Sequence, residues 1–520
     1  MFTVAILADL HLPDAADTVK ETVLDWALTE AKAQKVDLIV GAGDLTGTGT
    51  EAAAMRIRLK LEKTKIPFLL TPGNAEMRDP AWKKRSSAIL ATPRQYDHVV
   101  LLDSSTRMFA ARDRELLKEL TRQGGQNLLA VTHCPMATLD DGDRKLLEQA
   151  ASAGTIGQLV AGHYHSDTRE VKYSLVRGLD PDKAAGGAPA LALFTLDDSG
   201  NWSRRDIACP AADPRLWPEN ERREWLNHLG ISGMAAPLDS LALAVEAEVP
   251  AFEFRYDSIA KLDVSLLLTR LAAWRRRGGR YLSLQLPDLR WRDGILEGDV
   301  QIARAAGLAV ELHCDSVAIH APRVKLSVFR RAPEVRQLML EKMCALLKPV
   351  TDAGILVGVE NLHMSARDHK SGDRGFGYTP EECRGWIEAM RAVAGTPRIG
   401  LQLDIGHVRN NAPYSSLYTL SQWYASMGRE VVGFHLHQIR VKEDGSYTNH
   451  AALSGLFGKL ISLSSLFMAW RAGQLNHAPM FLEIREGSSF ESCQALRRDL
   501  ELMSFNAGTR QKLPAFADQV

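Results

Sequence analysis

Five short blocks in the first 165 residues place metal-capable side chains directly after apolar runs. The blocks are Ala8-Asp9-Leu10-His11, Gly43-Asp44, Gly73-Asn74, Thr132-His133 and Gly162-His163-Tyr164-His165. Asp and His bind divalent ions of the Zn, Mn and Fe type. One carboxylate, with Asp44 as the candidate, can bridge two ions, and ions about 3.5–4 Å apart can clamp a phosphate and activate water. The pattern predicts a dinuclear site that hydrolyses phosphoesters.

A second group of metal-capable side chains lies in the other half of the chain. It consists of Glu360, Asp404, His407, His435, His437 and Glu483. Two Glu, one Asp and one His form an oxygen-rich site that suits Mn, Zn, Co or Mg. His435 and His437 share one face of a predicted strand, so one can bind metal while the other meets substrate.

The first group needs an α/β domain to position it. Short apolar runs at 2–8, 36–40, 66–70, 127–131, 158–160 and 191–196 alternate with helical patterns such as 18–35. Such alternation is typical of an α/β fold, and sites in these folds lie outside the carboxyl ends of the strands. All five blocks fall at such ends. Glycines precede several ligands, where tight turns need small residues.

The second group needs a barrel. Predicted strands lie at 230–234, 252–256, 281–286, 316–320, 355–360, 399–404, 431–437 and 480–484. Eight strands over roughly 290 residues match a (β/α)8 barrel, whose chemistry lies at the carboxyl ends of its strands. We therefore divide the chain into a first domain at 1–210, a proline-marked linker or interdomain strap at 211–227, a barrel at 228–505 and a polar tail at 506–520.

Composition limits the partners and the compartment. Lys+Arg and Asp+Glu both number 63, so the formal net charge is zero, which disfavours nucleic acid as a partner without excluding a local basic patch. The six cysteines form no CxxC pair and fit reduced thiols. With no targeting signal and no long apolar segment, we expect a cytoplasmic protein without a membrane partner. Homo-oligomerisation stays open.

Residues 1–205 resemble the calcineurin-like metallophosphoesterases, which read D-x-H, G-D, G-N-H-D/E, a lone H and G-H-x-H. The resemblance implies a four-layer α/β sandwich and two divalent transition metals, Mn, Fe or Zn. It implies one metal held by Asp9, His11, Asp44 and His165, and a second held by Asp44, Asn74, His133 and His163.

One position departs from this pattern. The family's histidine after Asn is Ala75 here. That histidine usually contacts phosphate and can protonate the leaving group, and alanine does neither. We therefore expect metal binding, with hydrolysis that needs a good leaving group or a replacement acid. The neighbouring Glu76 either orients the Asn74 turn or is a solvated carboxylate.

Residues 228–500 resemble the xylose isomerase-like barrels, which include sugar epimerases and endonuclease IV. Their pattern of Glu, D-x-G/C-H, H-x-x-D and a final Glu maps onto Glu360, Asp404 with His407, His435, and Glu483. The resemblance implies one or more metals on Glu360, Asp404, His435 and Glu483. It also assigns Glu360, Glu483 and His407 as catalytic, and His320, His437 and His450 as substrate-binding.

Three functions stay open. The leading prediction is a bifunctional metalloenzyme that hydrolyses a phosphoester in its first domain and isomerises or epimerises a sugar-like molecule in its barrel, on a phosphorylated small-molecule substrate. The first alternative is a nucleic-acid processing or repair nuclease, although Thr448 stands where endonuclease IV has an Asp. The second is a first domain that binds metal and ligand without robust catalysis. His363 is interpreted as a surface or structural residue.

Overall fold

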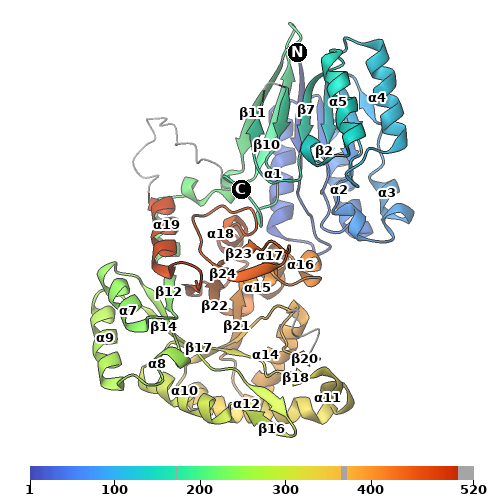
Figure 1. Cartoon of the computed structure of the whole chain (residues 1–520). Coiled ribbons are helices and arrows are strands. Elements are labelled where there is room, and N and C mark those ends of the chain that lie inside the picture. The colour runs from blue at the N-terminus through green and yellow to red at the C-terminus, as the bar shows by residue number, and fades with distance from the viewer. Residues whose placement is uncertain (171, 365–371, 502–520) are drawn as a thin grey trace.

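The computed structural model describes residues 1–170, 172–364 and 372–501. The predicted tail at 506–520 lies outside these ranges. The chain forms two α/β units, with the N-terminal half packed against the end of a barrel that carries α15–α18, β23 and β24 (Figure 1). Among the described residues, no helix combines the length and the apolar composition needed to cross a membrane.

The N-terminal half is a sandwich of two sheets. One sheet has the strand order β11-β10-β1-β2-β3 and the other β4-β5-β6-β7-β9-β8. The elements are β1 (Phe2–Leu7), α1 (Val19–Ala33), β2 (Leu38–Ala42), α2 (Glu51–Thr64), β3 (Phe68–Thr71), η1 (Glu76–Arg78), η2 (Trp82–Lys84), α3 (Ser86–Ile89), β4 (Gln95–Tyr96), β5 (Val99–Leu102), α4 (Ala111–Gln123), β6 (Leu128–Thr132), η3 (Met136–Thr138), α5 (Asp141–Ser152), β7 (Ile156–Ala161), β8 (Thr168–Arg169), β9 (Tyr173–Leu175), β10 (Ala190–Leu196) and β11 (Trp202–Ala208), where η marks a 3-10 helix.

Alternation along the strands builds four layers. Val40 of β2 and Val131 of β6 belong to one apolar cluster between the two sheets. The opposite face of the first sheet packs on α1 through residues such as Val23, and that of the second packs on α4 through Leu117. Because successive strand residues point to opposite faces, each sheet buries both sides. The predicted four-layer α/β sandwich is confirmed.

The C-terminal half is a closed barrel of eight parallel strands, as predicted. The strands are β12 (Leu229–Gly233), β13 (Ala251–Arg255), β14 (Tyr281–Gln285), β17 (Ser316–His320), β19 (Leu356–Glu360), β21 (Ile399–Asp404), β22 (Val431–Leu436) and β25 (Met480–Leu482). The remaining elements are α7 (Pro237–Glu246), α8 (Tyr256–Ile259), α9 (Val264–Arg276), β15 (Arg290–Arg292), β16 (Ile295–Glu297), α10 (Asp299–Glu311), β18 (Val324–Lys325), α11 (Leu326–Arg331), α12 (Pro333–Asp352), β20 (Asp373–Arg374), α14 (Pro380–Ala394), α15 (Ile405–Arg409), α16 (Tyr414–Leu417), α17 (Leu420–Met427), η6 (Gly428–Glu430), β23 (Gln438–Val441), β24 (Tyr447–Ala451), α18 (Ser464–Arg471) and α19 (Ser489–Glu501).

Strand register aligns the polar ends of the barrel strands. His320 pairs with Glu360 across β17 and β19, and Asp404 pairs with His435 across β21 and β22. These four residues close their strands or lie one residue from the end. Side chains that are far apart in the sequence therefore emerge side by side at the carboxyl end of the barrel.

The segment between the two units is folded. It contains η4 (Pro210–Ala212), η5 (Pro214–Leu216) and α6 (Glu219–Leu226). Trp225 of α6 is fully buried and stacks on Phe467 of α18 with 4.3 Å between ring centroids. Of the two alternatives, a linker or an interdomain strap, the structure favours the strap, because Trp225 supplies an apolar contact that a plain linker lacks.

Candidate metal centres

The predicted ligands of the N-terminal half converge at one edge of the sandwich. Asp9 and His11 follow β1, Asp44 follows β2 and Asn74 follows β3, while His133 follows β6 of the second sheet. His163 and His165 follow β7. Both sheets thus bring their strand ends to a common place, as the sequence predicts.

One ligand cluster joins Asp9, His11 and His165. Their ligand atoms all lie within 4.8 Å of one another, and all three residues are buried. The Nε2 atoms of His11 and His165 lie 3.2 Å apart, and Asp44 Oδ2 lies 3.6 Å from His11 Nε2. The predicted first set is therefore assembled.

The second cluster centres on His133. Its Nε2 lies 3.1 Å from Asn74 Oδ1, 3.2 Å from His163 Nδ1 and 3.4 Å from Asp44 Oδ1. The Nδ1–H of His133 donates to the carbonyl of Ala42 at 3.0 Å, which turns Nε2 toward the other ligand atoms. Burial disfavours a proton on His133, but the adjacent Asp44 carboxylate raises its pKa to about 9, so a metal bound at Nε2 would displace a proton. Asp44 turns one oxygen toward each cluster, as expected of a bridging carboxylate.

Electrostatics suit two cations at this edge. Burial lowers the pKa of His11 and His165 well below the usual value, and burial together with His133 lowers that of His163 to about 4. Neutral rings keep a lone pair for a metal. Burial opposes ionisation of Asp44, but His133 and the Ala75 N–H outweigh it and lower its pKa to about 2. A negative carboxylate beside the neutral rings of His11, His163 and His165 fits the predicted metals.

Several of these ligands have a strained backbone. Asp9, His11, Asp44, His163 and His165 have φ of 50°, 48°, 49°, 75° and 51°. The left-handed region costs non-glycine residues energy and persists where the surrounding structure requires it, often at functional sites. A neighbouring glycine makes room for the bridge: a Cβ on Gly73 would lie 2.2 Å from Asp44 Oδ1.

Glu76 orients the turn that carries Asn74. Its Oε2 accepts from the backbone N–H groups of Gly73 at 2.7 Å and Asp44 at 3.0 Å, and its Oε1 accepts from the Thr46 N–H at 2.7 Å. Glu76 is buried, so of the two predicted roles the structure supports the orienting one. Ala75 is fully buried, and its N–H donates to Asp44 Oδ1 at 2.6 Å.

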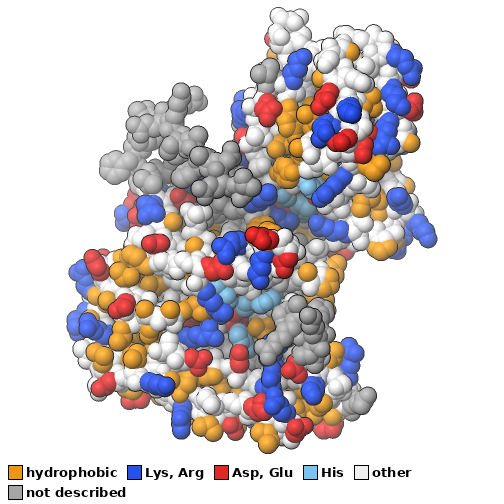
Figure 2. Space-filling view, in the orientation of Figure 1, with side chains coloured by type: hydrophobic (Ala, Val, Ile, Leu, Met, Phe, Trp, Pro, Cys, Tyr) orange, Lys and Arg blue, Asp and Glu red, His pale blue; other side chains and the backbone are white. Residues whose placement is uncertain are grey.

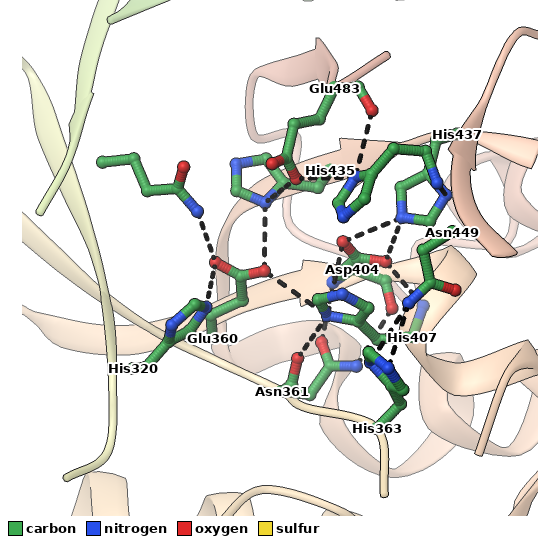
Figure 3. Close-up of polar contacts among 12 residues, drawn as sticks. His320, Glu360, Asn361, His363, Asp404, His407, His435, His437, Asn449 and Glu483 are labelled. Atoms are coloured by element: carbon green, nitrogen blue, oxygen red, sulfur yellow. Dashed lines mark hydrogen bonds and ion pairs between the residues drawn. The ribbon is translucent and has the colours of Figure 1, made fainter. Parts of the chain in front are cut away.

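The barrel assembles its own predicted metal set. Ligand atoms of Glu360, Asp404, His435 and Glu483 lie within 4.8 Å of one another, and all four residues are buried (Figure 3). His435 Nδ1 lies 3.3 Å from Glu360 Oε1 and 3.4 Å from Glu483 Oε2. Burial disfavours a proton on His435, but the surrounding carboxylates raise its pKa well above the usual value. The same negative charge would favour a metal cation.

A second histidine group lies beside this set. Ligand atoms of His407, His437 and His450 are also within 4.8 Å of one another. Asp404 joins the two groups, since its Oδ1 lies 3.0 Å from His437 Nε2 and its Oδ2 lies 3.5 Å from His407 Nδ1. Asp404 thus stands between two groups that could each hold a cation.

The two glutamates of the barrel differ in pKa. Burial opposes ionisation of Glu360, but His320 and His435 hold its pKa well below the usual value. Burial and the nearby Glu360 and Asp404 raise the pKa of Glu483 to about 7 despite His435. Neighbouring carboxyl groups whose pKa values are driven apart can serve as an acid and base pair.

The site opens into a cavity of about 310 Å³. Its wall includes the predicted residues Glu360, Glu483, His320, His407 and His450, together with Arg255, Arg323 and Arg485. His437, predicted to bind substrate, is absent from this wall; it is fully buried against Asp404. That position suits a role beside the metal set better than contact with substrate.

Two contributors escaped the sequence analysis. Glu253, in the middle of β13, accepts from His435 Nε2 at 2.9 Å and from the Ser283 hydroxyl at 3.0 Å. A carboxylate between Phe252 and Phe254 in a buried strand was the available signal. His363, interpreted from the sequence as a surface or structural residue, lines the cavity, and its ring centroid lies 4.8 Å from that of His407.

Two protein-family models match the chain, one in each half. Residues 2–167 match the model of the calcineurin-like phosphoesterase family, and residues 243–503 match that of the xylose isomerase-like TIM barrel family. No curated protein matches the chain.

Solved structures also match each half. A putative xylose isomerase from Rhodospirillum rubrum is 14% identical over 53% of this chain and 98% of its own, with a TM-score of 0.42. An L-ribulose 3-epimerase is 16% identical over 55% and 99%, with a TM-score of 0.38. A dimetal phosphatase from Danio rerio is 14% identical over 40% and 98%, with a TM-score of 0.31. The chain belongs to the xylose isomerase-like TIM barrel family and carries a calcineurin-like phosphoesterase domain ahead of its barrel.

Proposed function

We propose that this protein is a bifunctional metalloenzyme acting on a phosphorylated small molecule. The first domain hydrolyses a phosphoester, and the barrel isomerises or epimerises a sugar-like substrate. The observation that carries the first activity is the position of Asp44, which contributes one oxygen to each of two ligand clusters.

In the first domain, Asp9, His11, Asp44 and His165 would hold one divalent ion, and Asp44, Asn74, His133 and His163 a second. When bound, such ions polarise the phosphoester and lower the pKa of water. Ala75 offers no proton to the departing oxygen. The domain therefore acts best on substrates whose leaving group departs without protonation.

In the barrel, the split pKa values of two carboxyl groups support proton transfer at carbon. The ionised Glu360 removes a proton from a carbon next to a carbonyl, and the protonated Glu483 returns one. The bound metal would stabilise the negative charge that develops on the carbonyl oxygen. His320 lies 3.1 Å from Glu360 Oε2 and orients the base. Arg255 and Arg485 in the wall suit a phosphorylated sugar.

The first activity is tested with Asp44→Asn, which removes the bridging charge. We expect metal content to fall from two ions to one or none and turnover of an activated aryl phosphodiester to fall by about 100-fold or more. The exposed Asp198→Asn is the matched control and should match wild type. Wild-type turnover in the Asp44→Asn protein would refute the proposal.

The second activity is tested with Glu360→Gln and Glu483→Gln. A panel of free and phosphorylated ketoses is incubated in D2O, and incorporation of deuterium at carbon is followed by NMR. Each variant should lose exchange by about 100-fold or more while remaining folded. Glu388→Gln on the exposed face of α14 serves as the control. Undiminished exchange in either variant removes that residue from the mechanism.

Cleavage of nucleic acid by the barrel is a second candidate. It is favoured by the group of His407, His437 and His450, which gives the barrel a further place for a metal beside the carboxylate set. Binding and cleavage of duplex DNA with an abasic site, measured over a range of salt concentrations, distinguishes the two. Cleavage that depends on His450 would favour the nuclease, and deuterium exchange on a ketose would favour the epimerase.

A further inference from the structure

A cavity of about 190 Å³, partly open to solvent, lies between the two units. The N-terminal half contributes His11, Lys20, Arg78, Asp182 and Lys183 to its wall, and the barrel contributes Arg409 with hydroxyl side chains of α16 and the turn that follows. Four of these side chains are cationic and one is a carboxylate. Figure 2 shows histidine side chains in the N-terminal half and again over the barrel, with Lys and Arg side chains beside both.

The cations of this cavity are not equally neutralised. Lys20 Nζ is paired with Asp180 at 2.7 Å and with Asp182 at 3.2 Å. In contrast, within the described ranges the ammonium of Lys183 has no carboxylate within 4.0 Å and no hydrogen-bond acceptor. Burial and the neighbouring Arg409 lower the pKa of Lys183 to about 7, the response of an ammonium that lacks an anion beside it.

The two arginines present free donors. Arg409 donates from Nε to the carbonyl of Leu460 at 2.9 Å, and Arg78 donates from one terminal nitrogen to the carbonyl of Gly47 at 3.0 Å. Neither has a carboxylate within salt-bridge distance among the residues that the structure describes. Their remaining N–H groups are unpaired. Lys183 and Arg409 are half-buried and Arg78 is exposed. A cation that is partly removed from water gains from an anion beside it.

The cavity adjoins the phosphoesterase ligands. One of its walls is His11, whose Nε2 faces Asp44 and His165. Arg409 ends α15, which also carries His407, a residue of the barrel cavity. A single short helix therefore presents one residue to each site.

We propose that this cavity is a phosphate-binding subsite of the phosphoesterase centre, and that Arg409 of the barrel completes it together with Lys183 and Arg78. The inference rests on the proposed phosphoesterase function. Guanidinium groups bind phosphate oxygens in pairs, and an ammonium adds a compact charge. The substrate then carries, besides the phosphoryl group at the metals, a second phosphate within reach of His11.

The test is calorimetric titration of inorganic phosphate into the full-length, metal-loaded protein. Asp44→Asn removes the contribution of the metal pair, and phosphate binding at the subsite should remain. Adding Lys183→Gln or Arg409→Gln to that background should weaken the remaining affinity by about tenfold or more, and Arg409→Lys should weaken it less. Arg304→Gln, exposed on α10, is the matched control and should change nothing.

The outcomes separate the two proposals. Unchanged phosphate affinity after both Lys183→Gln and Arg409→Gln would overturn the subsite, as would an equal loss in Arg304→Gln. Circular dichroism establishes that the variants are folded, and metal analysis establishes that each double variant keeps the metal content of Asp44→Asn alone. Arg409→Lys gives the answer if Arg409→Gln does not fold. The phosphoesterase proposal fails separately, through wild-type turnover in Asp44→Asn.

Discussion

At the scale of single residues, the barrel site depends on a carboxylate that belongs neither to the cavity wall nor to the candidate metal ligands. Glu253 accepts the Nε2–H of His435, so the ring presents Nδ1 to Glu360 and Glu483. Such partners fix the tautomer and the orientation of a metal-binding histidine. His133 is held in the same way by the carbonyl of Ala42. In both sites, a group that is not itself a candidate ligand therefore orients a candidate ligand histidine.

Replacing Glu253 should therefore weaken metal binding. We expect Glu253→Gln to lower the affinity of the barrel for its metal by about 10–100-fold, because a neutral amide polarises and orients His435 less well. Competition with a chromogenic chelator measures the change, and the exposed Glu311→Gln on α10 is the control. Equal affinity in Glu253→Gln and wild type would show that His435 needs no such partner.

At the scale of elements, an ion pair joins the two outer helices of the second sheet. Asp143 of α5 accepts from Arg114 of α4 at 2.6 and 2.8 Å and from the Phe109 N–H at 2.7 Å. Burial alone would raise the pKa of Asp143, but Arg114 and the Phe109 N–H outweigh it and hold the pKa below 3.8. A bidentate contact of this kind fixes the angle between the two helices.

The lowered pKa of Asp143 makes the stability of the protein depend on pH. The depressed pKa means that Asp143 contributes stability above its unfolded value of 3.8 and loses it as the pH falls through the lower folded value. Asp143→Asn should cost about 1–2 kcal/mol at pH 7, and the difference from wild type should shrink below about pH 4. Urea unfolding at pH 7, 5 and 3.5 measures it. The exposed pair of Arg144 with Asp141 supplies the control, Asp141→Asn, which should cost little. A difference that stays constant with pH would contradict the assignment.

At the scale of the whole molecule, the two units are joined by buried polar contacts. Asp182 accepts from the Ser421 hydroxyl at 2.7 Å and from its N–H at 3.1 Å, and pairs with Lys20. Ala184 donates its N–H to the carbonyl of Gly458 at 3.0 Å. The residues from 180 to 185 thus tie the metal-binding edge of the sandwich to the barrel loops, beside the cavity that Arg409 and His11 line.

Weakening the contact between the two units should make them unfold at different temperatures. Asp182→Asn removes a buried charge from Lys20 and should cost about 3–5 kcal/mol. We expect calorimetry to resolve two unfolding transitions in this variant where wild type is more cooperative. Asp352→Asn, in an exposed pair with Lys348, is the control and should leave the thermogram unchanged. A thermogram of Asp182→Asn that matches wild type would show that other contacts hold the units together.

Local patterns in the sequence were sufficient for the architecture and for most of the ligands. Apolar runs define the strands, and the residue types that follow them name Asp9, Asp44, Glu360 and Asp404, because parallel strands bring their carboxyl ends to one edge. The alternation of side chains then fixes which face each residue occupies. The strand positions, the candidate ligands and the faces they occupy all depend on neighbours within a few residues. They can therefore be predicted from the sequence without the tertiary structure.

Contacts between distant segments were decided by the tertiary structure alone. The register of the barrel brings Glu253 beneath His435, the loop after β19 brings His363 to His407, and the docking of the two units brings Arg409 toward His11. No local sequence pattern encodes these contacts, because they depend on how the strands close into a barrel and how the helices pack. The sequence by itself determined which residues could bind metal. The packing of the two units decided which Lys and Arg side chains line the cavity beside the phosphoesterase ligands.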